Sequence, residues 1–396
     1  MVNNKQYLKE LCLIFSFIFI PFCSLYPMLG RKTQDWDQFS KDKQSKHEIM
    51  LQAPVIEARV DDQKVDQIAL AIQRCGICIA SDDRLAARLS NYDLDKSPFS
   101  QKKLLDDKDG TRDKMIKRGC ISVDFRTSDN KKINALLRFH PKAVANVIVL
   151  VGWNPGRVEG ASLLMDMLSR EKYNILFVNV RYHGRSEPGS LWWHLTDLGV
   201  HEPKDVIAAL NFLRYQTRHI MNGTTTIDTT QKPIFIYGIC AGAFHALNAV
   251  KVLKKDEVDQ LGLRGIIADG AWGRVSEVVK ETGLAMGSKN KVAQKLLMIV
   301  KWLFFDRSFK RHESKTCLYG KIGDLQVPVY FFHAKDDERA RLEHVKALFG
   351  DLHRTGKNPS VYLFDGNCHG ALYLKWKYLF RNALVAFLAS RIEAAS

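Results

Sequence analysis

Residues 234–246 read IFIYGICAGAFHA, the most informative stretch of the sequence. A strand-like run leads into Gly238, Cys240 and Gly242, and a helical pattern begins directly after them. Glycines two residues on either side of a central residue indicate a sharp strand-to-helix turn, where larger side chains would collide with the neighbouring strand and helix. Such a turn would lift the Cys240 sulfur above a sheet, at a helix N-terminus that favours the thiolate. The alternative is an inert cysteine in the core.

Short apolar runs alternate with helical segments on both sides of this turn. Runs rich in β-branched residues are typical of parallel strands that are buried on both faces, and their alternation with helices predicts a doubly wound α/β sheet. Residues 120–141 alternate apolar and polar residues around the turn SDNKK, which predicts an antiparallel hairpin. We therefore expect a mostly parallel sheet of about eight strands. The apolar runs are NVIVLVGW (146–153), NILFVNVR (174–181), PIFIYGI (233–239), LRGIIADG (263–270), VPVYFFHA (327–334) and SVYLFDG (360–366).

The pattern of residues divides the chain into three parts. Residues 1–32 contain an apolar segment, residues 33–117 form a polar and partly helical extension, and residues 118–396 carry the strand pattern. Residues 271–326 interrupt that pattern and include KLLMIVKWLFF (295–305), which is apolar nearly all round and must be covered. We expect this interval to be a helical lid inserted between two strands.

The apolar segment at the N-terminus favours a membrane anchor. Residues 11–29 carry no charge and just reach the length that spans a bilayer. Their core, Leu11 to Ile20, has the length of a signal sequence, but the residues around Pro21 and Cys23 do not form a small-x-small cleavage site. We expect a single uncleaved span, with export after signal removal as the alternative. Basic residues flank both ends, so the orientation stays open.

Composition limits the partners. The chain has 396 residues, 46% of them apolar, which suffices for a sizeable core. A formal charge of +16 would attract an anionic membrane surface, whereas no sequence motif for nucleic-acid binding accompanies it, so we expect no nucleic-acid partner. The eight cysteines are scattered, and Cys75 and Cys78 lack a second pair, which favours packing over a metal site. Nothing in the sequence implies a metal or an organic cofactor, and the oligomeric state is left open.

Two later strand ends carry an acid and a base. VYFFHAKDDERA (329–340) ends its strand with Asp336 and Asp337, and VYLFDGNCHGALY (361–373) ends the next one with His369. Thiol, carboxylate and imidazole in this chain order suit nucleophilic catalysis. The alternatives are a solvated pair of aspartates and a structural histidine. We interpret Cys368, beside His369, as a packing residue.

These motifs together resemble the α/β-hydrolase superfamily in its cysteine-nucleophile variant. The resemblance covers about residues 118–392 and includes VIVLVGWNPG, FVNVRYHGRSE, GICAGA, FFHAKDD and GNCHG, each in its family place. The Cys-Asp-His combination is similar to that of dienelactone hydrolases and of the acyl-CoA thioesterase and bile-acid acyltransferase group. The stretch NVRYHGRS resembles the family's DxRGHGxS loop, from which Asn179 and Tyr182 depart.

The resemblance implies a role for each member of the triad. Cys240 would attack an acyl carbonyl, His369 would activate the thiol as general base, and Asp337 would hold the imidazole. Asp337 is chosen over Asp336 because the family's acid follows three residues after a glycine, which is Ala334 in this chain.

The resemblance also implies an oxyanion hole made of backbone groups. The donors would be the N–H of Ala241 and, from the loop after VLVG, the N–H of Trp153. The chain has Val151-Gly152 where the family often has His-Gly. Asp269, which ends the preceding strand, is a further candidate for the acid.

Three functions remain open at this stage. The first is hydrolysis of acyl esters or thioesters through an acyl-cysteine, and the second is acyl transfer to an amine or alcohol by the same chemistry. The third is a non-catalytic binding protein, against which the complete set of triad residues argues. The aromatic lid residues Trp302, Phe304 and Phe305 could line a channel for a lipid-like acyl group, or the lid helix could simply pack on the sheet.

Overall fold

The computed structural model describes most of the chain from residue 115 onward and two earlier strands. The described residues are 55–58, 77–80, 115–117, 119–152, 164, 168, 172–187, 199–217, 220–222, 225–278, 281, 307–366, 369–370 and 372–393. The predicted anchor and the apolar part of the predicted lid lie outside these residues.

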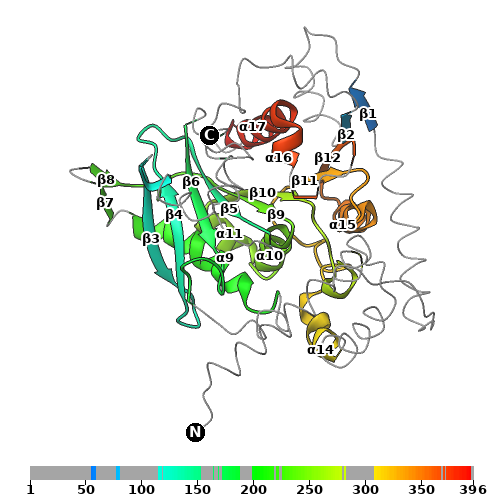
Figure 1. Cartoon of the computed structure of the whole chain (residues 1–396), viewed down its shortest axis with the longest axis horizontal. Helices are drawn as coiled ribbons and strands as arrows, with labels where there is room; N and C mark the ends of the chain where they lie inside the picture. The colour runs from blue at the N-terminus through cyan, green and yellow to red at the C-terminus, as the bar shows by residue number, and fades with distance from the viewer. Residues whose placement is uncertain are drawn as a thin grey trace, which may run out of the picture.

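One sheet of ten strands runs through the molecule (Figure 1). Its strands in spatial order are β1 (Val55–Ala58), β2 (Ile77–Ala80), β12 (Ser360–Phe364), β11 (Val329–Ala334), β10 (Leu263–Asp269), β9 (Ile234–Ile239), β5 (Ala145–Leu150), β6 (Tyr173–Asn179), β4 (Lys132–Arg138) and β3 (Cys120–Arg126). Within this sheet, among the described strands, only the pairs β3–β4 and β4–β6 are antiparallel. The eight strands from β3 to β12 in this sheet confirm the predicted mixed, doubly wound architecture.

β1 and β2 come from the segment that we expected to be polar and partly helical. They pair in parallel with each other, and β2 pairs in parallel with β12, so they extend the sheet beyond its last predicted strand. An apolar run as short as ICIA (77–80) cannot be told from the end of a helix by its periodicity, which is why sequence reasoning missed it. The helical patterns on either side lie outside the described residues.

Helices cover both faces of the sheet. α9 (Glu202–Asn211), α10 (Ala241–Val250), α11 (Lys255–Leu261) and α15 (Leu342–Arg354) pack on one face, and α16 (Leu372–Lys375) and α17 (Lys377–Glu393) pack on the other. Alternate strand residues contribute to opposite layers: Ile148 and Leu150 belong to the first, Val147 and Val149 to the second. Two apolar layers explain why the central strands read as continuous apolar runs.

Smaller elements complete the described chain. η3 (Phe212–Gln216) continues α9 as a π-helix, and β7 (Ile220–Asn222) pairs antiparallel with β8 (Thr225–Ile227). α14 (Arg307–Thr316) lies near the end of the predicted lid interval. Both described ends of that interval are buried, at Ala271 and Trp272 and again at Leu318 and Ile322, so they belong to the core. Among the described residues, no helix combines the length and the apolar character that a membrane span needs.

Candidate active site

Cys240 occupies the sharp turn between β9 and α10. Its backbone has φ 54° and ψ −114°, a conformation that non-glycine residues rarely adopt. Two backbone hydrogen bonds hold the turn: the Cys240 N–H donates to the carbonyl of Asp269 at 2.7 Å, and the Phe244 N–H donates to the carbonyl of Cys240 at 3.2 Å. The turn that the glycine spacing predicts is therefore present.

The flanking glycines are required by close backbone contacts. A Cβ atom at Gly238 would lie 2.5 Å from the backbone nitrogen of Ala243, and one at Gly242 would lie 2.3 Å from the carbonyl oxygen of Leu150. Both distances are far below any normal contact, and both involve backbone atoms that cannot move aside. These glycines allow α10 to start directly against β5 and β9, which leaves Cys240 at the end of the sheet.

His369 and Asp337 meet beside this turn. The Nδ1 atom of His369 lies 2.7 Å from the Oδ2 atom of Asp337. The other carboxylate oxygen of Asp337 accepts the backbone N–H groups of Arg339 and Ala340, both at 2.9 Å. Asp337 is buried, whereas the side chain of Asp336 is exposed. The structure thus brings Asp337 to the imidazole and leaves Asp336 in solvent.

The electrostatics of Cys240 and His369 favour an ion pair. Burial opposes ionisation of the Cys240 thiol, but the charge of His369 and its hydrogen bond to the sulfur lower the pKa of the thiol. Burial likewise opposes protonation of His369, yet the Cys240 sulfur and Asp337 raise its pKa well above its ordinary value. The pKa of the thiol falls while that of the imidazole rises, and both shifts are in the direction that favours transfer of the thiol proton to His369.

Of the two predicted oxyanion donors, the structure describes Ala241 but not Trp153. Ala241 is the first residue of α10, so its N–H has no partner within the helix and faces the Cys240 sulfur. Trp153 lies outside the described residues. The described chain ends just before it at Gly152, where an added Cβ would lie 3.3 Å from the Cβ of Cys240. Gly152, the last described residue after β5, therefore lies directly against the candidate nucleophile.

Asp269, the further candidate for the acid, has another environment. Its carboxyl is fully buried and its Oδ2 atom accepts the hydroxyl of Tyr237 at 2.6 Å. Burial raises the pKa of this carboxyl to about 7. The backbone carbonyl of Asp269 accepts the Cys240 N–H. The Nδ1 atom of His369, which the acid of a triad must bind, is bonded to Asp337 and not to Asp269.

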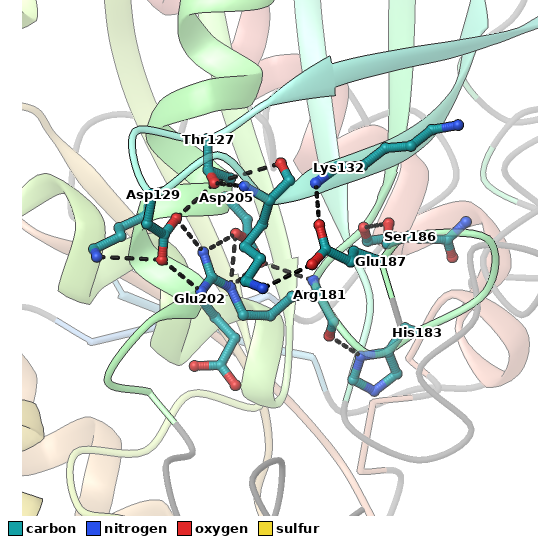
Figure 2. Close-up of polar contacts among 12 residues, drawn as sticks. Thr127, Asp129, Lys132, Arg181, His183, Ser186, Glu187, Glu202 and Asp205 are labelled. Atoms are coloured by element: carbon teal, nitrogen blue, oxygen red, sulfur yellow. Dashed lines mark hydrogen bonds and ion pairs between the residues drawn. The ribbon is translucent and has the colours of Figure 1, made fainter. Parts of the chain in front are cut away.

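A buried ionic network fixes the loop that follows β6 (Figure 2). The guanidinium of Arg181 donates to Asp205 in α9 at 2.7 and 2.9 Å and to Asp129 in the β3–β4 turn at 2.9 and 3.1 Å. Arg181 is 2% exposed and Asp205 is 0% exposed. On the outer side of the same loop, Glu187 accepts Lys131 at 2.7 Å. Sequence reasoning singled out the loop but missed these partners, which are distant in the chain.

A second polar cluster joins the two described ends of the lid interval to α15. His344 is fully buried, with its Nε2 atom 2.7 Å from Glu281, and its Nδ1 atom hydrogen-bonds to the hydroxyl of Tyr319. That hydroxyl also lies 3.1 Å from Glu277. Across the part of the chain that the structure describes, no group of three or more His, Cys, Asp or Glu residues could hold a metal ion. The sequence offered no signal for this cluster.

Comparison with known proteins supports the architecture. No family model matches the chain, and no curated protein sequence matches it either. Among solved structures, an esterase of Pyrococcus furiosus superposes with a TM-score of 0.51 at 16% identity, covering 69% of this chain and 91% of the esterase. An acylaminoacyl peptidase of Pyrococcus horikoshii superposes with a TM-score of 0.50 at 15% identity, covering 71% of this chain but only 43% of the peptidase. Together with the strand order and the turn at Cys240, this likeness shows that the chain has the α/β-hydrolase fold.

Proposed function

We propose that the chain hydrolyses acyl esters or thioesters through an acyl-cysteine intermediate. One arrangement carries this proposal: Cys240 sits on a strained turn beside His369, whose other ring nitrogen bonds to buried Asp337 at 2.7 Å. A thiolate, an imidazolium and a buried carboxylate in this order are the groups that acyl transfer to cysteine requires. The esterase and the peptidase that share the fold are consistent with it.

The chemistry follows from these positions. The Cys240 thiolate adds to the acyl carbonyl carbon, and the N–H of Ala241 stabilises the developing oxyanion. When the tetrahedral adduct collapses, His369 gives its proton to the departing alcohol or thiol, and an acyl-cysteine remains. Neutral His369 then takes a proton from water as the water oxygen attacks the thioester, the carbon–sulfur bond breaks, and the electron pair returns to sulfur. Asp337 stabilises the imidazolium at each stage.

The two adjacent aspartates provide a matched test. We expect Asp337→Asn to lower kcat for p-nitrophenyl acetate by about two to four orders of magnitude, because the imidazole loses its negative partner. The same substitution at exposed Asp336 should change kcat by less than about threefold, since a solvated carboxylate contributes little. Initial rates of both variants, with thermal unfolding to check the fold, make this comparison. A sensitive Asp336 beside an insensitive Asp337 would show that the acid is assigned wrongly.

We also propose that residues 11–29 hold the enzyme at a membrane. The support is the uncharged run itself, together with the absence of a small-x-small cleavage sequence after it. We expect the full-length protein to stay in the membrane pellet after carbonate extraction and to retain its original N-terminus. Recovery in the supernatant, or a mature chain that starts near residue 25 to 32, would instead establish export.

A further inference from the structure

The end of β10 contacts both the candidate nucleophile and the candidate base. The carbonyl of Asp269, the last residue of β10, accepts the backbone N–H of Cys240 at 2.7 Å. The next residue, Gly270, lies against the imidazole of His369. A Cβ atom added to Gly270 would be 3.2 Å from the Cε1 atom and 3.3 Å from the Nδ1 atom of that ring. The backbone of Cys240 and the ring of His369 therefore both meet two consecutive residues of one strand end.

The backbone at Gly270 has little freedom to move away from the ring. Its N–H donates to the carbonyl of Phe332 in β11 at 2.9 Å. The side chain of the preceding Asp269 is fully buried and accepts the hydroxyl of Tyr237 at 2.6 Å, which anchors this strand end. Gly270 also has φ 62°, in the left-handed region that glycine adopts without strain. A side chain at this position would therefore have to displace the imidazole, because the strand is held in place.

The imidazole of His369 is confined by two further contacts. Its Nδ1 atom lies 2.7 Å from Asp337, and this bond sets the direction of the ring. The residue after His369, Gly370, packs so closely on Ile239 that an added Cβ would lie 3.1 Å from the Cγ2 atom. The atoms of the ring that meet Gly270 are Cε1 and Nδ1. A ring pushed from that side by a few tenths of an ångström would lose its alignment with the carboxylate and with the sulfur.

We propose that Gly270 is a positioning residue for the general base: because it has no side chain, the imidazole of His369 can lie against the strand end that also holds the backbone of Cys240. The role of His369 as the base rests on the proposed function, whereas the contact between its ring and Gly270 does not. Proton transfer between a thiol and an imidazole requires close and aligned groups, so a displaced ring would slow each step that uses it. The same displacement would weaken the interaction that favours the thiolate.

The test is Gly270→Ala in the purified full-length protein, because a methyl group is the smallest side chain that reaches the ring. With p-nitrophenyl acetate, we expect kcat to fall by about tenfold or more, since a small misplacement of a catalytic group is costly. The pH profile of Cys240 alkylation by iodoacetamide, followed by mass spectrometry, gives a readout that does not need turnover. Its midpoint should rise by about half a pH unit or more, because the thiolate loses part of its interaction with the imidazolium.

The control is Gly356→Ala, which imposes a similar backbone strain away from the site. Gly356 has φ 74°, and an added Cβ there would meet no heavy atom of the described chain within 4 Å beyond its own neighbours in sequence. Gly356 precedes β12 whereas His369 follows it, so the two residues lie at opposite ends of that strand. We expect Gly356→Ala to lower the melting temperature but to keep the wild-type kcat and the wild-type alkylation midpoint.

A second background tests whether the new methyl group acts through the ring. His369→Ala removes the imidazole and leaves room for a side chain at Gly270. The fall in melting temperature that Gly270→Ala causes should therefore be smaller in the His369→Ala background than in the wild type, and the alkylation midpoint should no longer respond to it. If Gly270→Ala alone fails to fold, the double variant should recover the fold. Neither measurement requires hydrolytic activity.

The outcomes separate this proposal from the proposed function. A folded Gly270→Ala protein with the wild-type kcat and alkylation midpoint would overturn the positioning role, even if the chain hydrolyses esters. Equal effects with and without the ring, a double variant that stays unfolded, or an equal rise of the midpoint in Gly356→Ala would attribute the effect to the backbone and reject the proposal. A midpoint that rises only in Gly270→Ala, in a chain without hydrolytic activity, would support the contact with His369 and contradict the proposed function.

Discussion

Replacement of Cys240 by alanine is expected to lower the hydrolysis of p-nitrophenyl acetate by about four to six orders of magnitude. Without the sulfur no acyl-enzyme can form, and His369 has only the slow direct activation of water left to it. Alanine adopts the strained backbone at this position with the same penalty as cysteine, so the protein should stay folded. Initial rates and thermal unfolding check both statements, and a β-lactone probe should label the wild type at residue 240 but not the variant.

Cys240→Ser is the matched control for the chemistry of the sulfur. Serine keeps the shape of the turn and the contact with His369, but its hydroxyl is far less acidic than a thiol. The ion pair that lowers the pKa of Cys240 and raises that of His369 therefore cannot form with an alkoxide. We expect weak activity, well below that of the wild type and above that of the alanine variant. Alanine-variant turnover at the wild-type level would refute the assignment of the nucleophile.

Much of this site could be predicted from the sequence because backbone requirements are written into it. The turn at Cys240 follows from Gly238 and Gly242, since their added Cβ atoms would collide with the backbone of α10 and β5. The chain order of thiol, acid and base could be predicted because Cys240, Asp337 and His369 each come shortly after an apolar strand pattern, at β9, β11 and β12. The choice of Asp337 over Asp336 came from the family resemblance and not from the physical chemistry of the residues. In the structure the N–H groups of Arg339 and Ala340 orient the buried carboxylate of Asp337, and the local sequence does not reveal this.

The missed features depend on contacts between distant segments. The ring of Trp272 stacks on Phe244 in the first turn of α10, and nothing in the local sequence around either residue indicates that stacking. His344 and Glu281 likewise meet only when the lid interval folds onto α15. β2 was missed for another reason: its four residues are too few to carry a periodic signal.

Arg181→Met is expected to lower the free energy of unfolding by about 3–5 kcal/mol, the typical consequence of removing one partner from a buried ion pair. Arg181 donates its guanidinium to Asp205 and Asp129, and its backbone N–H also donates to Asp205 (Figure 2). Methionine fills much of the same space but leaves the Asp205 carboxylate buried without a cation. Urea unfolding at neutral pH measures the loss. The double variant Arg181→Met/Asp205→Leu should recover part of it, because no unpaired charge remains.

Lys131, which lies in the β3–β4 turn and binds Glu187 on the same loop, gives a control. Its Nζ atom lies 2.7 Å from Glu187, but both side chains are partly exposed, at 41% and 33%, so Lys131→Met should change the stability far less than Arg181→Met.

The pH dependence of stability gives a second check. Arg181 holds the pKa of Asp129 well below its usual range, so that contribution is present above the unfolded pKa and is lost as the pH falls. Burial raises the pKa of Asp205 even in the wild type, where Arg181 opposes that rise. Without Arg181 we expect it to rise further, and this destabilisation is relieved as the carboxyl takes up a proton. Both effects have the same sign, so the stability difference between wild type and variant should narrow as the pH falls. The Asp205 part is lost as that carboxyl takes up its proton, and the Asp129 part is lost mainly below about pH 4. A difference that is small at neutral pH, or one that widens in acid, would mean that the network does not hold the loop through its charges.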